Sequence, residues 1–149
     1  MKTFSRLRND EKSIDFRVCN RVMVYGTLRR GMHNHDTFLK GAISLGQFLV
    51  PGFIMWTNSG SFIPYVTPGH QHIQVEAYEL KSPEMLRQLD CLEGHPDFYL
   101  RSMIYHNDVS YWIYIIPQDK AIKLFRSSGI NIIPDGDYVQ WRHDNKGFK

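Results

Sequence analysis

Residues 86–96, with the sequence LRQLDCLEGHP, constrain the fold of this chain more than any other segment. Each residue of an α-helix turns by about 100°, so Glu93 would share one side of a helix with Leu86 and Leu89. A carboxylate on an apolar helix face must be paired, line a cavity or have a raised pKa, because burying its charge without compensation is costly. Glu93 is therefore a candidate general acid and base.

The ends of this helix are also marked in the sequence. Ser82 is a suitable N-cap, Pro83 suits the first turn, and Gly94 suits the C-cap. Glu93 can be an acid that faces the core, or merely the frayed last residue of the helix, from which a side chain reaches water easily. Asp90 lies about 110° from the apolar centre of the same helix, which predicts a partly solvated structural acid.

A second segment, residues 21–28, combines a strand with a loop. Val22 and Val24 occupy alternate positions, which predicts a half-buried strand, and Gly26-Thr27 ends it. Consecutive backbone N–H groups in such a turn can converge on an anion, and glycine lets a ligand approach the backbone closely. The alternative is an ordinary turn. The glycine spacing and the lysine of a nucleotide-binding P-loop are missing.

Together the two segments resemble the gamma-glutamylcyclotransferase-like superfamily, in particular its small AIG2-like members that act on gamma-glutamyl amines. The resemblance extends from about residue 21 to about residue 141. Tyr-Gly-Thr-Leu alone is short enough to occur by chance, whereas its combination with Leu-Asp-x-x-Glu-Gly and a following Tyr-x-Arg is specific. The matching residues are 24–31 (VYGTLRRG), 34–35 (NH), 52–53 (GF), 63–64 (IP), 75–78 (VEAY), 89–94 (LDCLEG) and 98–101 (FYLR).

The resemblance implies an intramolecular reaction that uses no metal or organic cofactor. In that family the free α-amine of a gamma-glutamyl group attacks its own γ-carbonyl, which releases an amine or amino acid and forms 5-oxoproline. By position, Glu93 would accept a proton from the α-ammonium group and later donate one to the leaving nitrogen. The anionic part of the substrate would be held by the backbone N–H groups of a loop formed by Tyr25, Gly26, Thr27 and Leu28.

The resemblance also assigns two tyrosines to the pocket. Tyr99 lies where the family has a tyrosine near the acid, and Tyr114 lies on a later strand that often lines the pocket. Each hydroxyl could donate a hydrogen bond to the substrate, although most of the 8 tyrosines are expected to serve packing. Val75 stands where many members have glycine, and we expect it to leave less room in the pocket.

Other chemistries are weaker alternatives. Cys91 could be a nucleophile, but helix geometry turns it away from the apolar side that holds Glu93. A non-catalytic module, either binding a small ligand or serving as an interaction scaffold, is the alternative to an enzyme; Glu93 favours the enzyme, because binding alone needs no proton carrier. Two His-x-His pairs, His33 with His35 and His70 with His72, could bind a metal such as zinc. No Cys-x-x-Cys motif accompanies them, so we predict no metal site.

The length and composition suit one small domain. We expect an N-terminal extension over residues 1–20, the gamma-glutamylcyclotransferase-like domain over residues 21–142 and a polar tail over residues 143–149. The net charge of +3 is too small to indicate a nucleic-acid partner. No apolar run reaches the roughly 18 residues of a membrane span, and the first residues lack the apolar core of a signal peptide. With two cysteines that suggest no disulfide framework, we expect a cytoplasmic protein without membrane contact.

The order of elements predicts an α+β fold, because consecutive strands alternate with only two or three helices. The resemblance implies a small mixed β-barrel flanked by a few helices. The amine half of the substrate and the oligomeric state stay open. Helices are expected over residues 35–40, 82–93 and 119–125, and strands over 21–24, 42–56 (one or two, broken near 51–52), 62–66, 73–80, 102–105, 109–116 and 138–141 (a strand or extended piece).

Overall fold

A computed structural model describes residues 14–145 of the chain. Its strands form one six-stranded sheet in the order β4-β5-β1-β3-β2-β6. β1 pairs with β5 in parallel and with β3 antiparallel, so the sheet is mixed. The elements are β1 (Arg21–Val24), α2 (His35–Leu39), β2 (Ile43–Asn58), β3 (Tyr65–Glu79), α3 (Pro83–Glu93), β4 (Leu100–His106), β5 (Val109–Ile115), α4 (Gln118–Ser127), β6 (Ile130–Ile132), the 3-10 turn η1 (Pro134–Gly136) and α5 (Tyr138–Asp144).

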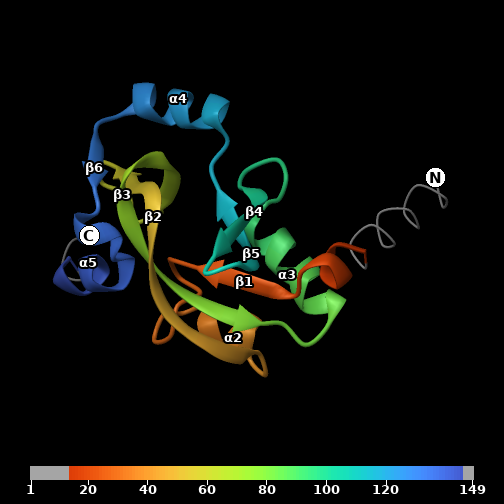
Figure 1. Ribbon diagram of the computed structural model, residues 1–149. Helices are drawn as coiled ribbons and strands as arrows, with labels where there is room; N and C mark the ends of the chain where they lie inside the picture. Colours follow the sequence, from red (N-terminus) through yellow and green to blue (C-terminus); the bar gives the residue numbers. More distant parts are fainter. Residues whose placement is uncertain (1–13, 146–149) are drawn as a thin grey trace.

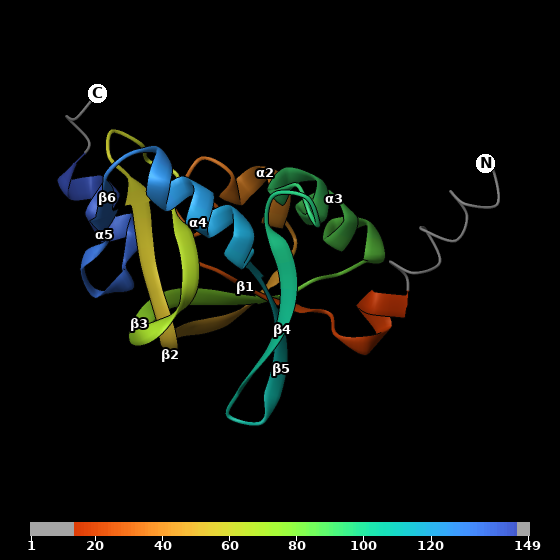
Figure 2. The ribbon, with the colours of Figure 1, turned by 90° about the horizontal axis from the view of Figure 1, so that it is seen from above.

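The sheet curls into a half-barrel with helices around it (Figure 1), which confirms the predicted α+β class and mixed barrel. In both ribbon views, α3 and the β4–β5 hairpin lie on one side of the molecule, and α5 and β6 lie on the other (Figure 2). The later strands β4, β5 and β6 therefore form the two edges of the sheet, and the earlier strands β1, β3 and β2 lie between them.

The long hairpin of β2 and β3 gives the sheet most of its curl. We expected a break near residues 51–52 and two separate strands over 62–66 and 73–80. Instead β2 is continuous and β3 runs unbroken from Tyr65, with register shifts on both sides of Phe53. Pro68 and Gly69 lie at this irregularity, where a bulge bends paired strands without separating them. Residues 62–64 precede β3 and belong to no strand.

The β4–β5 hairpin is confirmed. Asn107 and Asp108 connect the two strands with φ angles of 52° and 66°, the left-handed conformation that a two-residue hairpin turn requires. The predicted helix over residues 119–125 is also confirmed as the central part of α4. The short edge strand β6 was not predicted.

The prediction for residues 138–141 was wrong, because they form the first turn of helix α5 and not a strand. Asp137 caps this helix: its carboxylate accepts a hydrogen bond from the backbone N–H of Gln140 at 3.2 Å. Tyr138 is buried against the core and holds the helix in place. Residues 143–145 of the expected polar tail continue this helix or follow it, and residues 146–149 lie outside the described part of the chain.

β1 was predicted to be half-buried, and this too was wrong. Val22 and Val24 pack in one apolar cluster with Leu86 and Leu89 of α3, whereas Met23 packs in a second cluster on the opposite face of the sheet. Both faces of β1 are covered because the strand lies in the middle of the sheet, between β5 and β3. Apolar contacts on both sides fix the position at which the following loop begins.

The N-terminal segment contacts the domain where the structure describes it. Residues 14–18 are helical, and Phe16 packs against the cluster under α3. The carboxylate of Asp15 lies 2.9 Å from the guanidinium of Arg101. Residues 1–13 of the expected extension lie outside the described part of the chain. Cys19 is buried and Cys91 is exposed, as helix geometry predicted for Cys91, and both are free thiols.

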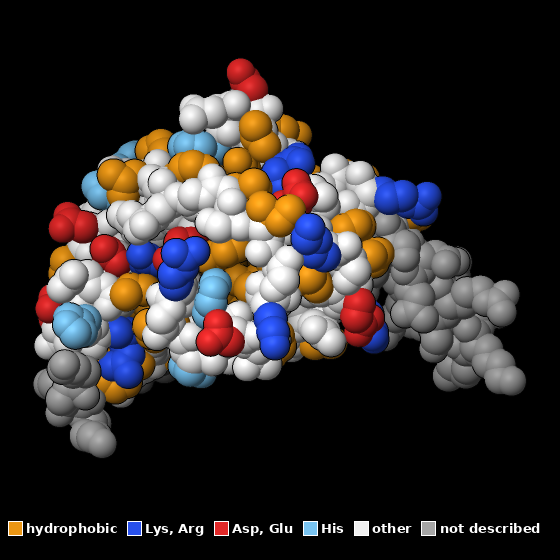
Figure 3. All heavy atoms as spheres, turned by 90° about the horizontal axis from the view of Figure 1, so that it is seen from below, with side chains coloured by type: hydrophobic (Ala, Val, Ile, Leu, Met, Phe, Trp, Pro, Cys, Tyr) orange, Lys and Arg blue, Asp and Glu red, His pale blue; other side chains and the backbone are white. Residues whose placement is uncertain are grey.

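The surface offers two further observations. Among residues 14–145, no helix has the length and apolar character needed to cross a membrane. On the face shown in Figure 3, basic and acidic side chains are interspersed. The cytoplasmic location and the absence of a nucleic-acid partner stay predictions.

Candidate active site

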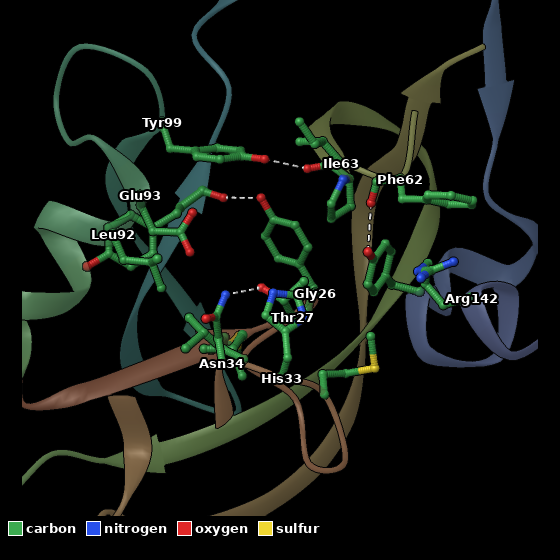
Figure 4. A pocket seen from close by; sticks show the side chains of 18 residues that line it. Gly26, Thr27, His33, Asn34, Phe62, Ile63, Leu92, Glu93, Tyr99 and Arg142 are labelled. Atoms are coloured by element: carbon green, nitrogen blue, oxygen red, sulfur yellow. Dashed lines mark hydrogen bonds between the residues drawn. The ribbon is translucent and has the colours of Figure 1, made fainter. Parts of the chain in front are cut away.

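A cavity of about 370 Å³ opens between the C-terminal end of α3, the loop after β1, residues 62–64 and α5 (Figure 4). All seven residues that the sequence nominated line this cavity, although they come from four separate parts of the chain. They are Glu93, Tyr25, Gly26, Thr27, Leu28, Tyr99 and Tyr114.

Glu93 is the last residue of α3, and its side chain faces the cavity (Figure 4). Leu86 and Leu89 on the same side of the helix are fully buried, and Gly94 ends the helix in the left-handed conformation with φ 69°. Within residues 14–145, no group forms a hydrogen bond or ion pair with the Glu93 carboxylate. Burial withholds hydration from the carboxylate and raises its pKa from 4.5 to about 7.

The loop after β1 presents backbone N–H groups that the described part of the chain leaves unused. Across residues 14–145, no hydrogen bond uses the N–H of Gly26, Thr27 or Leu28. Asn34 holds the loop in shape, because its amide donates to the Thr27 hydroxyl at 2.9 Å and its N–H donates to the Thr27 carbonyl at 3.1 Å. A Cβ atom at Gly26 would lie 3.0 Å from the ring of Pro64, so a larger residue would press on the cavity wall.

Arg29 ties this loop to two distant elements. Its buried guanidinium donates to the carboxylates of Glu76 in β3 and Asp137 at the start of α5, both at 2.9 Å. Glu76 also accepts the N–H of Arg30 at 2.8 Å and the hydroxyl of Tyr78 at 2.8 Å. Arg29, Glu76 and Tyr78 belong to segments that carry the family resemblance, but the sequence indicated no role for them. The sequence could not show that Arg29 pairs with Glu76, because the two residues are 47 positions apart.

The three tyrosine hydroxyls donate to protein acceptors. Tyr99 donates to the carbonyl of Pro64 at 2.6 Å, and Tyr25 donates to the carbonyl of Tyr114 at 2.5 Å. Tyr114 itself donates to the carboxylate of Asp90 at 2.7 Å. Burial raises the pKa of all three phenols well above 10, which keeps them protonated. Toward a bound molecule these oxygens are available as acceptors, whereas we had expected donors.

The prediction that Asp90 is partly solvated was wrong. Its side chain is 1% exposed and lies 2.8 Å from the guanidinium of Arg101 in β4. Together with Tyr114 of β5, Arg101 covers the side of α3 that helix geometry alone leaves open to water. Arg101 is itself buried and lies over the ring of Trp112, with 4.3 Å between Cζ and the ring centroid. The arginine of the Tyr-x-Arg motif, Arg101, is therefore the ion-pair partner of Asp90.

The expected effect of Val75 on the pocket was also wrong. Val75 is fully buried in the cluster on the opposite face of the sheet and is not among the lining residues. Of the histidines, His33 lines the cavity and His35 places Nδ1 2.9 Å from the carbonyl of Leu28. Within the described residues, no group of three or more His, Cys, Asp or Glu side chains could hold a metal ion.

Comparison with known proteins agrees with this geometry. A family model described as "Gamma-glutamyl cyclotransferase, AIG2-like" matches residues 22–140, which include every nominated site residue. The chain belongs to this family.

Known proteins match between about half and four fifths of this AIG2-like chain. A Methanocaldococcus jannaschii protein named "Putative gamma-glutamylcyclotransferase" is 34% identical over 129 residues, which cover 81% of this chain and 97% of that protein. The gamma-glutamylaminecyclotransferase of Rattus norvegicus is 35% identical over 91 residues, or 56% of this chain and 60% of that one. The crystal structure of an AIG2-like protein from Mus musculus matches with a TM-score of 0.62 at 26% identity, covering 79% of this chain and 88% of that chain.

Several lining residues of this AIG2-like chain were not nominated from its sequence. Tyr138 and Arg142 belong to α5. Because this helix was not predicted, the sequence offered no reason to place these two side chains at the cavity. Phe62 precedes β3 in a segment that was expected to be a strand. An amphipathic pattern starting from an Asp N-cap at residue 137 was the signal that could have revealed α5.

Proposed function

We propose that this chain is a gamma-glutamyl cyclotransferase that releases 5-oxoproline and a free amine or amino acid from a gamma-glutamyl substrate. The observation that carries this proposal is the Glu93 carboxylate, which faces the cavity, has no partner within residues 14–145 and has a pKa of about 7. A general acid and base works best when its pKa is close to the operating pH. The unused N–H groups of residues 26–28 supply the complementary anion site on the same cavity.

In this mechanism Glu93 moves the proton that the reaction requires. The ionised carboxylate accepts a proton from the substrate α-ammonium, which frees the amine to attack the γ-carbonyl carbon. A bond forms between the α-nitrogen and that carbon, and the bond to the leaving nitrogen breaks as Glu93 returns the proton to it. The second proton of the α-nitrogen follows to the leaving amine as the ring nitrogen becomes an amide. No step calls for a metal or organic cofactor.

The loop and the tyrosines would hold the substrate for ring closure. The N–H groups of Gly26, Thr27 and Leu28 would donate to the α-carboxylate. The hydroxyl oxygens of Tyr99 and Tyr114, whose protons are engaged, can accept from the α-ammonium group. Holding the amine and the carbonyl at attack distance supplies part of the barrier reduction, because the ring closure is intramolecular.

The test is 5-oxoproline release from a panel of gamma-glutamyl amines and gamma-glutamyl dipeptides, with the native protein and Glu93→Gln. We expect the substitution to lower kcat/KM by about 10²- to 10⁴-fold, the usual contribution of a general acid or base. Glu84→Gln, on the exposed side of the same helix, is the matched control and should keep full turnover. A folded Glu93→Gln protein with native turnover would remove Glu93 from the mechanism.

The second candidate is a module on the same fold that binds a small ligand without converting it. It would bind members of the panel at equilibrium and release no product. The unpaired acid favours the enzyme, because a carboxylate with a pKa near 7 costs stability and gives a simple binder no advantage.

A further inference from the structure

Arg142 stands on the side of the cavity opposite Glu93 (Figure 4). It belongs to the C-terminal half of α5 and lies two positions beyond the residues that the family model matches. Its guanidinium lies over the ring of Phe62, with 3.9 Å between Cζ and the ring centroid, and this contact fixes its direction. The family likeness therefore assigns this side chain no role, and its surroundings must supply one.

The guanidinium of Arg142 is incompletely paired. Its Nη1 atom is buried and has no hydrogen-bond partner, the one such side-chain atom within residues 14–145. The acids of the same helix are engaged elsewhere: Asp137 pairs with Arg29, and Asp144 accepts a hydrogen bond from Gln140. A buried donor without an acceptor lowers stability, so its presence beside a cavity indicates a ligand that supplies the acceptor.

Two buried arginines show what the half-buried Arg142 lacks. Arg29 donates to Glu76 and Asp137, and Arg101 donates to Asp90. Each of these guanidiniums has a carboxylate within 2.9 Å, which offsets the cost of burying its charge. The charge of Arg142 is offset by no ion pair among the described residues. An anion at this position would both accept from Nη1 and offset the charge of the guanidinium.

We propose that Arg142 binds a carboxylate on the leaving half of the substrate, so that this protein prefers gamma-glutamyl amino acids over gamma-glutamyl amines that have no carboxylate there. This inference rests on the proposed function. The α-carboxylate of the gamma-glutamyl half is matched to the N–H groups of residues 26–28, which leaves the guanidinium of Arg142 for a second carboxylate. A guanidinium suits this task, because its planar set of donors can engage both carboxylate oxygens.

Matched substrate pairs test the proposal directly. Gamma-glutamyl-alanine and gamma-glutamyl-ethylamide differ only in the carboxylate of the leaving half, as do the conjugates of the lysine ε-amine and of 1,5-diaminopentane. In the native protein we expect kcat/KM to be about 10- to 100-fold higher for the carboxylate member of at least one pair. In Arg142→Gln that ratio should fall to about one, whereas Arg142→Lys should keep part of it.

The ratio separates recognition from a structural role of Arg142. A variant that folds poorly loses turnover with both members of a pair, so the ratio is unaffected by the amount of folded protein. Arg126→Gln, on the exposed end of α4, removes a charge outside the cavity and should leave the ratio at its native value. Equal losses with both members, or no preference in the native protein, would overturn the proposal.

Binding measurements distinguish failure of this inference from failure of the proposed function. If no member of the pairs releases 5-oxoproline, the proposed function fails. Calorimetric titration with the same pairs then tests whether Arg142 binds the carboxylate. Tighter binding of the carboxylate member, lost in Arg142→Gln, would support the anion site. Equal binding of both members, or binding of neither, would overturn it. The Glu93→Gln protein allows the same titration when the native protein turns the substrates over.

Discussion

Two carboxylates of helix α3, Asp90 and Glu93, lie three residues apart and have opposite surroundings. Asp90 is enclosed by protein, with Arg101 at 2.8 Å and the Tyr114 hydroxyl at 2.7 Å. Glu93 faces the cavity, and within residues 14–145 it has no hydrogen-bond or ion-pair partner. The two side chains point in directions about 60° apart around the helix, and helix geometry by itself does not explain why Asp90 is the enclosed one.

The difference lies in which elements cover each side chain. β4 and β5 bring a cation and a hydroxyl to Asp90, which makes it a structural acid. Glu93 lies past the end of this cover, where the chain turns away at Gly94 and the cavity begins. The partners of Asp90 hold its side chain in place, whereas Glu93, which has no such partner within residues 14–145, can exchange a proton near neutral pH.

Asp90→Asn should have the largest effect on stability. The substitution leaves the buried guanidinium of Arg101 without its main anion, which typically lowers the free energy of unfolding by about 3 to 5 kcal/mol. Urea unfolding monitored by circular dichroism measures this loss. Glu84→Gln, which breaks an exposed ion pair with Arg87 on the same helix, is the control and should be nearly neutral. Equal effects of the two substitutions would contradict the distinction between buried and exposed acids.

Tyr114→Phe should have an intermediate effect. It removes the hydroxyl that donates to Asp90 at 2.7 Å while keeping the ring in the core. A hydrogen bond to a charged acceptor contributes about 1.5 to 3 kcal/mol to the free energy of unfolding. In a double-mutant cycle with Asp90→Asn, the two losses should be less than additive, because both substitutions remove the same contact. Full additivity would show that the two groups act independently.

Glu93→Gln should stabilise the protein above pH 7, opposite in sign to the effect of Asp90→Asn. The folded pKa of Glu93 is about 7, above the value of 4.5 for a free side chain. Between these values the folded state retains a proton that the unfolded state releases, so the free energy of unfolding falls as pH rises through this window. Gln cannot ionise and avoids this fall, which we put at roughly 1 to 3 kcal/mol.

Unfolding of the native protein and Glu93→Gln in urea at pH 5 and at pH 8 measures this difference. Comparing the two proteins cancels the titration of all other groups. If the free energies of unfolding of both proteins change equally between the two pH values, Glu93 ionises as it does in water. The proposed difference between the surroundings of Glu93 and Asp90 would then be wrong.

The change in kcat/KM with each pH unit should be the smallest of these effects. The base form of Glu93 is needed to accept the proton of the α-ammonium group, so kcat/KM should fall on the acid side of a pKa of about 7. The loss is about fivefold between pH 7 and pH 6 and approaches tenfold for each further unit. Initial rates of 5-oxoproline release from pH 5 to pH 8 give this profile. A flat profile across pH 6 to 7 would mean that another group carries the proton.

Much of the site could be predicted from the sequence because its signals are local. The positions of Leu86 and Leu89 direct Glu93 to the apolar side of a helix, and the residues that cap this helix are neighbours in sequence. The loop at Gly26 and Thr27 follows its strand directly, so both halves of the site were recognisable from short segments. Local patterns are reliable here because helix periodicity and turn chemistry depend on residues within a few positions of each other.

What the sequence did not predict depends on contacts between distant segments. Whether Asp90 meets water or Arg101 depends on how β4 packs against α3, and helix geometry cannot supply that. α5 was missed for the same reason, and with it the tyrosine and arginine that it contributes to the cavity.

The sequence by itself determined the candidate acid, the candidate anion loop, most of the helices and strands, and the likeness to one family. The tertiary structure decided which acid is paired and which is free, because a pKa depends on the charges, donors and water around a carboxyl group. It also decided that Arg142, distant from Glu93 in sequence, faces the same cavity. Those surroundings come from segments that only the curled sheet brings together.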